Sequence, residues 1–209
     1  LLGADYWRWY LMANAPESDD TSFTWQQFAE AVNKDLVGTL GNFVNRCAAQ
    51  VTRHFDGVVP SGGETGVEER ALVERIETIV GDYNGYLDGL EFRKAAQALR
   101  ALWAEGNVYL EAREPWRAIK SDRELAAMTL RTALGVVRLH AHLSSPFIPS
   151  TSERIAATLP DAPALVGVGA ELAASVLDLN PGTRFVAPDL LFQKLDDDLV
   201  ATWAERFGS

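Results

Sequence analysis

The feature that most constrains this chain is a long run of apolar residues spaced three and four positions apart. Between residues 24 and 54 this spacing places the apolar side chains on one face of an α-helix. At 1.5 Å per residue, about 30 residues form a helix of roughly 45 Å. We therefore expect a helix long enough to be the spine of a bundle. The stripe comprises Trp25, Phe28, Ala29, Val32, Leu36, Leu40, Phe43, Cys47, Ala48 and Val51.

The rest of the sequence repeats this helical pattern, so the predicted fold class is all-α, a helical bundle. Residues 1–22 are interpreted as the end of a connecting region, residues 23–159 as the bundle, and residues 160–209 as a Pro- and Gly-rich strap with a closing helix. Further helices are predicted over 1–14, 67–87, 91–114, 121–143, 150–159 and about 196–207. Capping-box spacing marks four starts, at Thr24 with Gln27, Thr65 with Glu68, Ser121 with Glu124 and Ser150 with Glu153.

Catalytic and metal-binding patterns are missing from the sequence. It contains no phosphate-binding glycine loop followed by lysine, no dinucleotide-binding glycine motif after a strand, and no His-Glu-x-x-His. His140 and His142 are two apart, which points them to different faces of a helix, and Asp196 to Asp198 suit a helix start. We therefore expect no catalytic residue and no metal site.

The single cysteine, Cys47, lies in the apolar stripe and predicts a buried thiol. One cysteine allows no intrachain disulfide, which favours a reducing, cytoplasmic setting. No apolar run approaches the about 18 residues of a membrane span, so no membrane partner is expected.

The charge distribution limits which nucleic-acid contact is compatible with the chain. The net charge of −10, from 19 basic and 29 acidic residues, argues against a broad nucleic-acid footprint. Residues 91–138, however, contain nine basic and six acidic residues, while the segments on both sides are acidic. The pattern favours a small contact with unpaired nucleotides over a duplex footprint.

Two features could make such a contact. Asn42 and Arg46 lie one turn apart on the spine, beside the apolar stripe, and their side chains are of the kinds that read base edges and phosphate. Trp116 follows Pro115 at a helix end in basic surroundings, which suits a stacking platform for an unpaired base. The simpler explanations are that Asn42 and Arg46 lie on a solvated polar face and that Trp116 closes the end of the bundle. The candidate phosphate contacts are Arg53, Arg113, Arg117 and Lys120.

Five segments in this order resemble the anticodon-binding region of bacterial methionyl-tRNA synthetases. Each is modest alone, but together they extend over nearly the whole chain in register. They are residues 3–11 (GADYWRWYL), 33–36 with 40–46 (NKDL and LGNFVNR), 109–110 with 114–116 and 120 (YL, EPW and K), 143–149 (LSSPFIP) and 192–195 (FQKL).

The resemblance implies a helical bundle of the class I aminoacyl-tRNA synthetase type that binds the CAU anticodon of methionine tRNA. In that family an Asn and an Arg one turn apart and a Trp after a Pro contact the unstacked anticodon bases, at positions that match Asn42, Arg46, Pro115 and Trp116.

The family's catalytic domain activates methionine with ATP and contains His-Ile-Gly-His and Lys-Met-Ser-Lys-Ser signatures, which this sequence lacks. The resemblance therefore implies that ATP and methionine bind outside this chain, which should be inactive alone as part of a longer protein. Its implied partners are methionine tRNA and its own catalytic domain, towards which the tail folds back. No oligonucleotide-binding domain follows in this sequence, so a monomer is expected.

Two other hypotheses remain open from the sequence. The bundle could belong to another class I synthetase, for cysteine, leucine, isoleucine or valine, although Asn42 and Arg46 combined with Pro115-Trp116 argue against this. Alternatively, the chain could be a non-catalytic helical interaction module whose partner surface is the aromatic helix at residues 6–12. Competition among tRNAs, and the sequence that precedes Leu1, would separate these hypotheses.

Overall fold

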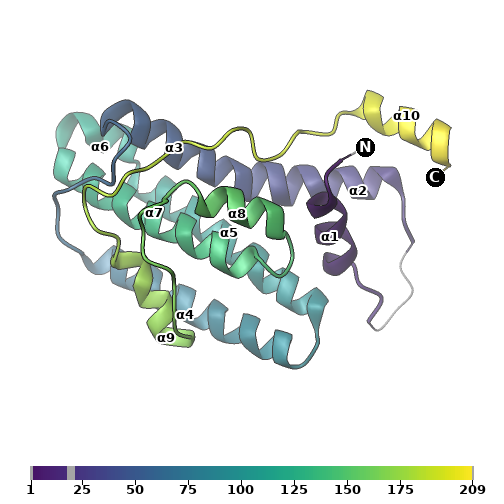
Figure 1. Cartoon of the computed structure of the whole chain (residues 1–209), viewed down its shortest axis with the longest axis horizontal. Helices are drawn as coiled ribbons and strands as arrows, with labels where there is room; N and C mark the ends of the chain where they lie inside the picture. Colours follow the sequence, from purple (N-terminus) through teal and green to yellow (C-terminus); the bar gives the residue numbers. More distant parts are fainter. Residues whose placement is uncertain (1, 18–21, 209) are drawn as a thin grey trace.

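The computed structural model describes residues 2–17 and 22–208, and in these residues the fold is helical, as predicted (Figure 1). The closest approach to a strand there is an isolated antiparallel bridge between Val58 and Arg184. The helices are α1 (Ala4–Ala13), α2 (Trp25–Ala31), the π-helix η1 (Val32–Gly41), α3 (Asn42–His54), α4 (Val67–Asp88), α5 (Phe92–Arg113), α6 (Pro115–Ser121), α7 (Arg123–Ser144), α8 (Pro149–Ala156), α9 (Gly169–Ala174), the 3₁₀-helix η2 (Ser175–Leu177) and α10 (Asp197–Phe207).

The predicted spine is one continuous helical segment, but its winding changes along its length. Helix α2 passes into π-helical η1 and then into α3, with helical backbone angles at both junctions. Its start is as predicted, because the Thr24 hydroxyl accepts a hydrogen bond from the Gln27 amide at 3.1 Å. Every residue of the apolar stripe is buried. The sequence pattern did not predict the π-helical section, since the apolar spacing fits both windings.

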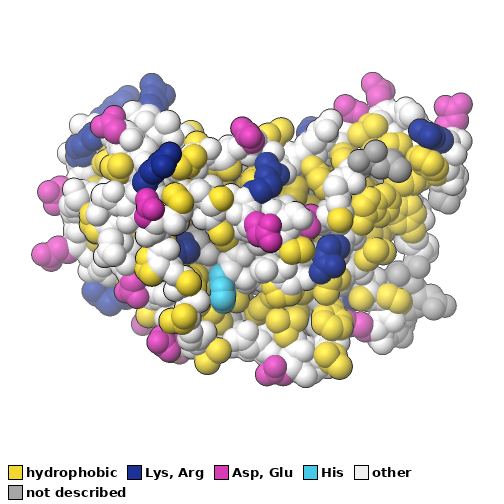
Figure 2. Space-filling model, in the orientation of Figure 1, with side chains coloured by type: hydrophobic (Ala, Val, Ile, Leu, Met, Phe, Trp, Pro, Cys, Tyr) yellow, Lys and Arg dark blue, Asp and Glu magenta, His cyan; other side chains and the backbone are white. Residues whose placement is uncertain are grey.

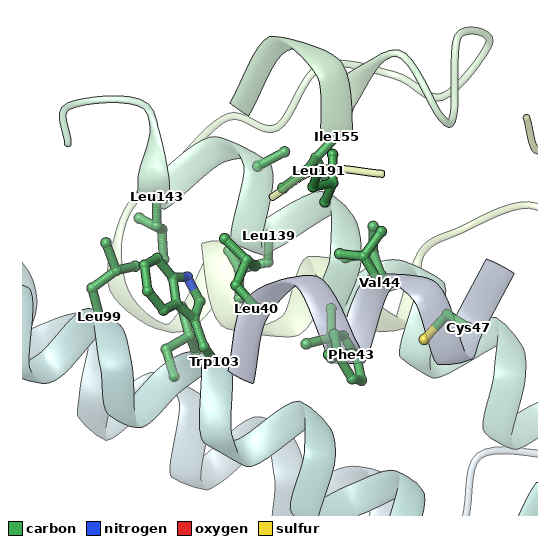
Figure 3. Packing of buried hydrophobic residues seen from close by; sticks show 14 of the residues in the cluster. Leu40, Phe43, Val44, Cys47, Leu99, Trp103, Leu139, Leu143, Ile155 and Leu191 are labelled. Carbon is green, nitrogen blue, oxygen red and sulfur yellow. The ribbon is translucent and has the colours of Figure 1, made fainter. Parts of the chain in front are cut away.

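Helix α7 lies in the middle of the bundle (Figure 1). Most of its residues are buried, on nearly all sides of the helix. A helix that is apolar all round has to be enclosed by other elements, and here α3, α5, α6, α8 and η2 enclose it. Gly135 allows the closest approach, because a Cβ there would lie 1.9 Å from the Val176 carbonyl oxygen. Figure 3 shows spine, α5, α7, α8 and tail side chains meeting in this core, among them Phe43, Trp103, Leu139, Ile155 and Leu191.

Three of the four predicted capping pairs were misplaced, although α4 begins at Val67 as predicted. Helix α4 begins after Gly66, whose N–H donates to the Glu69 carboxylate at 2.9 Å, so the pairing is one residue later than the sequence suggested. Helix α7 is capped by Asp122 and not by the predicted Ser121. The Asp122 carboxylate accepts a hydrogen bond from the Leu125 amide at 2.9 Å, which is the bond that defines an N-cap. Helix α8 begins at Pro149, which favours the first helical position.

The Pro- and Gly-rich tail that begins at residue 160 packs against this chain's own bundle. After two short helices that the sequence did not predict, α9 and η2, the tail runs along the spine to α10 (Figure 1). The Asn33 amide group holds it in both directions, donating to the Leu195 carbonyl at 2.6 Å and accepting from the Leu195 N–H at 2.9 Å. Tail side chains from both halves are buried in the common core, including Leu172, Val176, Phe185, Phe192 and Leu195.

The aromatic helix at residues 6–12 is not the free surface that the interaction-module hypothesis requires. Trp9 is fully buried and Tyr10 is 6% exposed. The Trp9 indole N–H donates to the buried Asp35 carboxylate at 3.1 Å, and the Trp7 ring lies 4.5 Å from that of Phe28. Its aromatic side chains therefore join α1 to the spine.

Over residues 2–17 and 22–208, none of the helices combines the length and the hydropathy that crossing a bilayer demands. In the same residues no three His, Cys, Asp or Glu side chains gather as a metal site would require.

His140 is fully buried on α7, and its position links stability to pH. The ring Nε2 lies 3.1 Å from the Leu102 carbonyl oxygen, while Nδ1 has no hydrogen-bond partner among the described residues. Burial lowers the pKa of His140 from 6.5 to about 3. The folded protein therefore keeps this ring neutral at a pH where the unfolded chain protonates it.

We expect this residue to lower the free energy of unfolding as the pH falls from about 6.5 towards 3. Over that window the unfolded state binds one more proton, which corresponds to at most about 1.4 kcal/mol per pH unit. His140→Gln should remove this part of the pH dependence in urea unfolding, whatever its effect at pH 7. His142→Gln, at an exposed position on the same helix, is the control and should keep it. An unchanged slope in His140→Gln would contradict the assignment.

Candidate nucleic-acid interface

Two facing pairs of polar side chains join α3 to α5. Asn42 and Arg46 lie one turn apart on α3, and Asn107 and Glu111 lie one turn apart on α5. The Asn42 amide donates to the Asn107 amide oxygen at 3.3 Å, and the Arg46 guanidinium forms an ion pair with Glu111 at 3.0 Å. The side chains of Arg46 and Glu111 are 30% and 69% exposed, so this ladder of contacts lies at the surface.

The structure brings Trp116 to the same place. Pro115 is the first residue of α6 and is buried, and Glu114 before it has left-handed backbone angles of φ 42° and ψ 55°, which turn the chain between α5 and α6. Trp116 therefore lies in the first turn of a short helix, whereas the sequence placed it at a corner outside any helix. The Arg46 guanidinium carbon is 4.8 Å from the centre of the Trp116 ring, which is a cation–π contact.

Trp116 also packs against the hydrophobic core and is only partly exposed. It packs on the bundle on one side and faces solvent on the other, so both interpretations of Trp116 stay compatible with the structure. The arrangement leaves part of an aromatic ring accessible beside a cation.

An open groove of about 420 Å³ lies between α3 and α5. Its polar groups include amide and guanidinium donors and carboxylate and amide acceptors, the groups that hydrogen-bond to base edges. The Asn107 amide nitrogen donates to the carbonyl oxygens of Thr39 and Trp103, at 3.0 and 3.2 Å, which fixes its oxygen towards Asn42. The lining consists of Gly38, Thr39, Asn42, Arg46, Ala104, Asn107, Val108 and Glu111.

The sequence reasoning missed Asn107 and Glu111. Their spacing of four on the helix predicted over 91–114 repeats that of Asn42 and Arg46, and this was the available signal. It becomes informative only when α3 and α5 are known to face each other. Periodicity within one helix carries no information about its neighbour.

The four candidate phosphate contacts have different surroundings. Arg53 and Lys120 are exposed, and no ion pair involves either of them within the part of the chain that the structure describes. Arg117 is 75% exposed and pairs with Glu114 at 2.8 Å. Figure 2 shows Lys and Arg side chains gathered over the end of the molecule where α3 and α6 lie in Figure 1.

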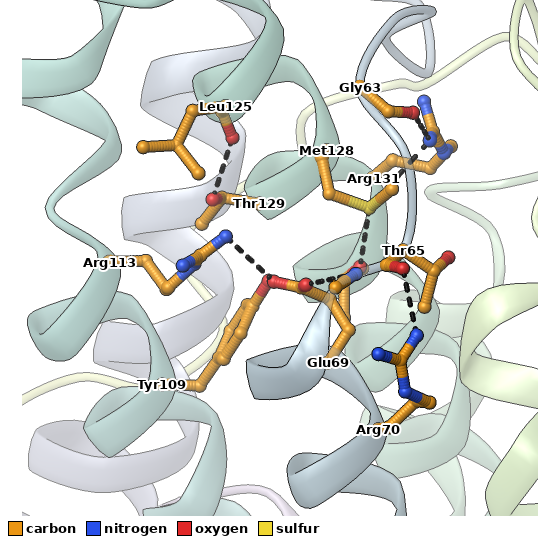
Figure 4. A network of polar contacts seen from close by, with 12 residues as sticks. Gly63, Thr65, Glu69, Arg70, Tyr109, Arg113, Leu125, Met128, Thr129 and Arg131 are labelled. Carbon is orange, nitrogen blue, oxygen red and sulfur yellow. Dashed lines mark hydrogen bonds and ion pairs between the residues drawn. The ribbon is translucent and has the colours of Figure 1, made fainter.

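Arg113 is the exception, because its guanidinium is 3.1 Å from Glu69, which is fully buried. Glu69 also accepts hydrogen bonds from the Tyr109 hydroxyl at 2.7 Å and from the Gly66 N–H at 2.9 Å (Figure 4). Burial and the bond to Glu69 raise the pKa of Tyr109. The network ties the last turn of α5 to the first turn of α4, directly before the Glu114 turn.

The spacing between the two groove helices is set by Gly106. A Cβ at this position would lie 2.7 Å from the Phe43 ring, closer than real Cβ contacts. Phe43 follows Asn42 in sequence and Gly106 precedes Asn107, so this contact lies directly beneath the amide pair. Helix separation and the polar ladder are therefore linked by neighbouring residues.

The family model described as "Anticodon binding domain of methionyl tRNA ligase" matches residues 59–209. The chain belongs to the methionyl-tRNA ligase family. The model described as "tRNA synthetases class I (M)" matches residues 1–48 of the chain. The resemblance found in the sequence is confirmed, and the hypothesis of a class I synthetase for another amino acid is set aside.

Relatives within this family align with the whole chain. The methionine–tRNA ligase of Caulobacter sp. (strain K31) is 48% identical, over 100% of this chain and 37% of its own length. That of Streptomyces avermitilis is 47% identical, over 100% of this chain and 36% of its own length. The chain thus spans somewhat more than a third of the length of the curated relatives it matches.

Solved structures of the family share the fold. The apo form of Mycobacterium tuberculosis methionyl-tRNA synthetase superimposes with a TM-score of 0.81 at 26% identity, over 93% of this chain and 39% of that one. The same enzyme bound by methionyl-adenylate gives 0.79 at 27% identity, over 92% and 38%. The helical bundle seen here is therefore the family's anticodon-binding domain fold.

Substituting Gly106 tests how tightly the groove helices are packed. Gly106→Ala should destabilise the protein by about 1–3 kcal/mol, because overpacking forces α3 and α5 apart. Gly85→Ala, at a helical position with nothing within 4 Å of the added carbon, should stabilise it by about 0.5–1 kcal/mol. Urea unfolding of both variants measures the difference. Equal stabilities would show that the Phe43 contact does not set the spacing.

Removing the charge of Glu69 tests the buried network. Glu69→Gln should cost about 3 kcal/mol, the lower end for breaking a buried ion pair, since Arg113 keeps a 21% exposed side chain. The control is Glu105→Gln, which breaks the exposed 2.8 Å pair with Arg75 and should cost less than about 1 kcal/mol. Denaturant unfolding of the two variants is the comparison. A similar small cost for both would contradict a structural role for Glu69.

Proposed function

We propose that this chain recognises the CAU anticodon of methionine tRNA for a methionine–tRNA ligase. The observation that carries the proposal is the position of Arg46, which pairs with Glu111 at the groove and lies over Trp116. One side chain thereby connects a hydrogen-bonding groove with an aromatic surface. Single-stranded RNA recognition depends on this combination of base-edge contacts and stacking.

Binding would exchange contacts within the protein for contacts with the anticodon. The Asn42–Asn107 and Arg46–Glu111 pairs are surface pairs, so an entering base can replace them at small cost. Asn42 and Arg46 would then donate to base acceptors or to the adjacent phosphate, while the oxygens of Asn107 and Glu111 accept from base amino groups. Trp116 would stack on a splayed base, which contributes about 1–3 kcal/mol.

The charge around the groove suits a short contact. Arg53, Arg117 and Lys120 would approach the phosphates beside the anticodon loop, and Glu69 holds Arg113 turned inward. Few cations and an acidic remainder should give a shallow salt dependence, about 0.7 in log affinity per log salt for each single-stranded phosphate neutralised. The surface would therefore select a loop over a duplex.

The chemical steps would belong to the other part of the ligase. We infer that ATP and methionine bind there, because this sequence lacks the catalytic signatures and offers no assembled nucleophile, base and oxyanion donor. This chain would hold the tRNA so that its acceptor end reaches that site. We infer that the protein performs this role in the cytoplasm, together with its tRNA.

Replacing Trp116 tests the proposal directly. Trp116→Ala should weaken binding of methionine tRNA roughly tenfold to a hundredfold, because the aromatic stack is lost. Trp116→Phe should keep part of it. Leu11→Ala, at a 61% exposed apolar position on α1, is the control and should bind normally. Affinities are measured by fluorescence titration at fixed salt, with circular dichroism to check the fold.

The same titration with a tRNA that carries one changed anticodon base tests what is read. The unchanged chain should prefer the CAU anticodon, and Arg46→Gln should reduce that preference because a base-edge donor is lost. Equal affinity for both tRNAs would overturn anticodon recognition. Normal binding by folded Trp116→Ala would remove the stacking role.

A further inference from the structure

A second cavity, of about 320 Å³, lies between α7, α8 and the segment that follows α8. It shares no lining residue with the groove between α3 and α5. Its volume is at the small end of the about 300–1,000 Å³ usual for ligand pockets. Most of its wall is apolar, and the polar exceptions are Arg138, His142, Ser145, Ser152 and Glu153.

Arg138 is the unusual member of this wall. It is 9% exposed, and its Nη2 donates to the Ser175 carbonyl oxygen at 2.7 Å. Its Nε and Nη1 have no hydrogen-bond partner among residues 2–17 and 22–208, and no carboxylate of these residues forms an ion pair with it. A buried cation with unmet donors is costly, and an anion would relieve that cost.

Ser152 adds a second unmet group. Its side chain is in the same wall, the residue is 3% exposed, and its hydroxyl has no partner in the described residues. A guanidinium and a hydroxyl together can donate to two oxygens of one carboxylate. Both residues line the cavity, but their unmet atoms are closed to solvent, so a carboxylate reaches them only when these two side chains turn towards it.

The walls and the remaining charges narrow the choice of anion. Ala141, Ile155, Ala156, Leu159 and Leu165 line the cavity and suit an aliphatic group. Glu153 is also in the wall, so a multiply charged anion such as phosphate would be repelled. Burial lowers the pKa of Arg138, and the charge of Asp178 partly opposes this shift without forming an ion pair with the guanidinium.

We propose that this cavity binds a small aliphatic carboxylate, with Arg138 and Ser152 holding the carboxylate and the apolar wall holding the chain. Two sources share this chemistry, a simple aliphatic acid and a free α-amino acid with an apolar side chain. The amino acid also carries an ammonium group, which can donate hydrogen bonds to the Glu153 carboxylate. The inference is independent of tRNA recognition.

The probes are 4-methylpentanoate, L-leucine and 4-methylpentan-1-amine, titrated into the ¹⁵N-labelled chain and followed by amide chemical shifts. The two carboxylates should saturate with shifts on α7 and α8, and the amine should give none. Arg138→Met should weaken carboxylate binding at least tenfold, while Arg93→Gln, at an exposed arginine outside the cavity, should not change it. Arg138→Met removes a buried charge, so its fold is checked by the same spectra.

A second variant keeps the test decisive if Arg138→Met does not fold. Ala156→Trp fills the cavity from an exposed position on α8 and should abolish binding with Arg138 intact. If leucine binds more tightly than 4-methylpentanoate and Glu153→Gln removes this difference, the ligand type is an amino acid. If 4-methylpentanoate binds more tightly, the ligand type is a simple aliphatic acid. No saturable shift at about 10 mM probe, or binding unaffected by both variants, would overturn the proposal.

Discussion

The contact between Phe43 and Gly106 is the constraint on which the polar groove depends. The missing side chain at Gly106 lets α5 approach the spine until the Phe43 ring occupies the space of a Cβ. At that separation the amide and guanidinium groups of α3 reach their partners on α5. A larger separation would leave the same residues as unrelated surface groups. Core packing therefore determines the geometry of a surface site.

The placement of Trp116 depends on a second set of buried contacts. Glu69 holds Arg113 and Tyr109 at the end of α5, and the left-handed turn at Glu114 then starts α6 with Pro115. Pro115 is buried, and this positions the next residue, Trp116, with its ring beneath the Arg46 guanidinium. The accessible face of Trp116 thus results from interactions that are themselves mostly hidden from solvent.

The groove between α3 and α5 and the cavity beside α8 each contain an arginine, and the surroundings of the two guanidinium groups differ. At the groove, Arg46 is paired with a partner that is 69% exposed, an arrangement that water screens and that a ligand can replace. At the cavity beside α8, Arg138 is nearly enclosed and keeps two unmet donors. The first arrangement suits exchange with a large, solvated RNA, whereas the second suits a small ligand that leaves water behind. The roles proposed for Arg46 and Arg138 therefore differ because the two side chains differ in burial.

Much of this protein could be predicted from local sequence. The spacing of apolar residues predicted the spine, the six other helices expected from the sequence and the burial of Cys47, because helical periodicity is a property of neighbouring residues. The same periodicity put Asn42 and Arg46 on one face of α3. The candidate role of these residues in anticodon binding is still a prediction.

Which helices face each other depends on packing between segments that are distant in sequence. Packing brings Asn107 and Glu111 opposite Asn42 and Arg46, and it turns Arg113 towards Glu69. The tail lies on its own bundle, and part of the spine is π-helical. These outcomes depend on contacts between residues far apart in sequence, whose energies no local pattern contains. Local sequence patterns are sufficient for the helices and their polar faces, whereas packing determines which of those faces meet.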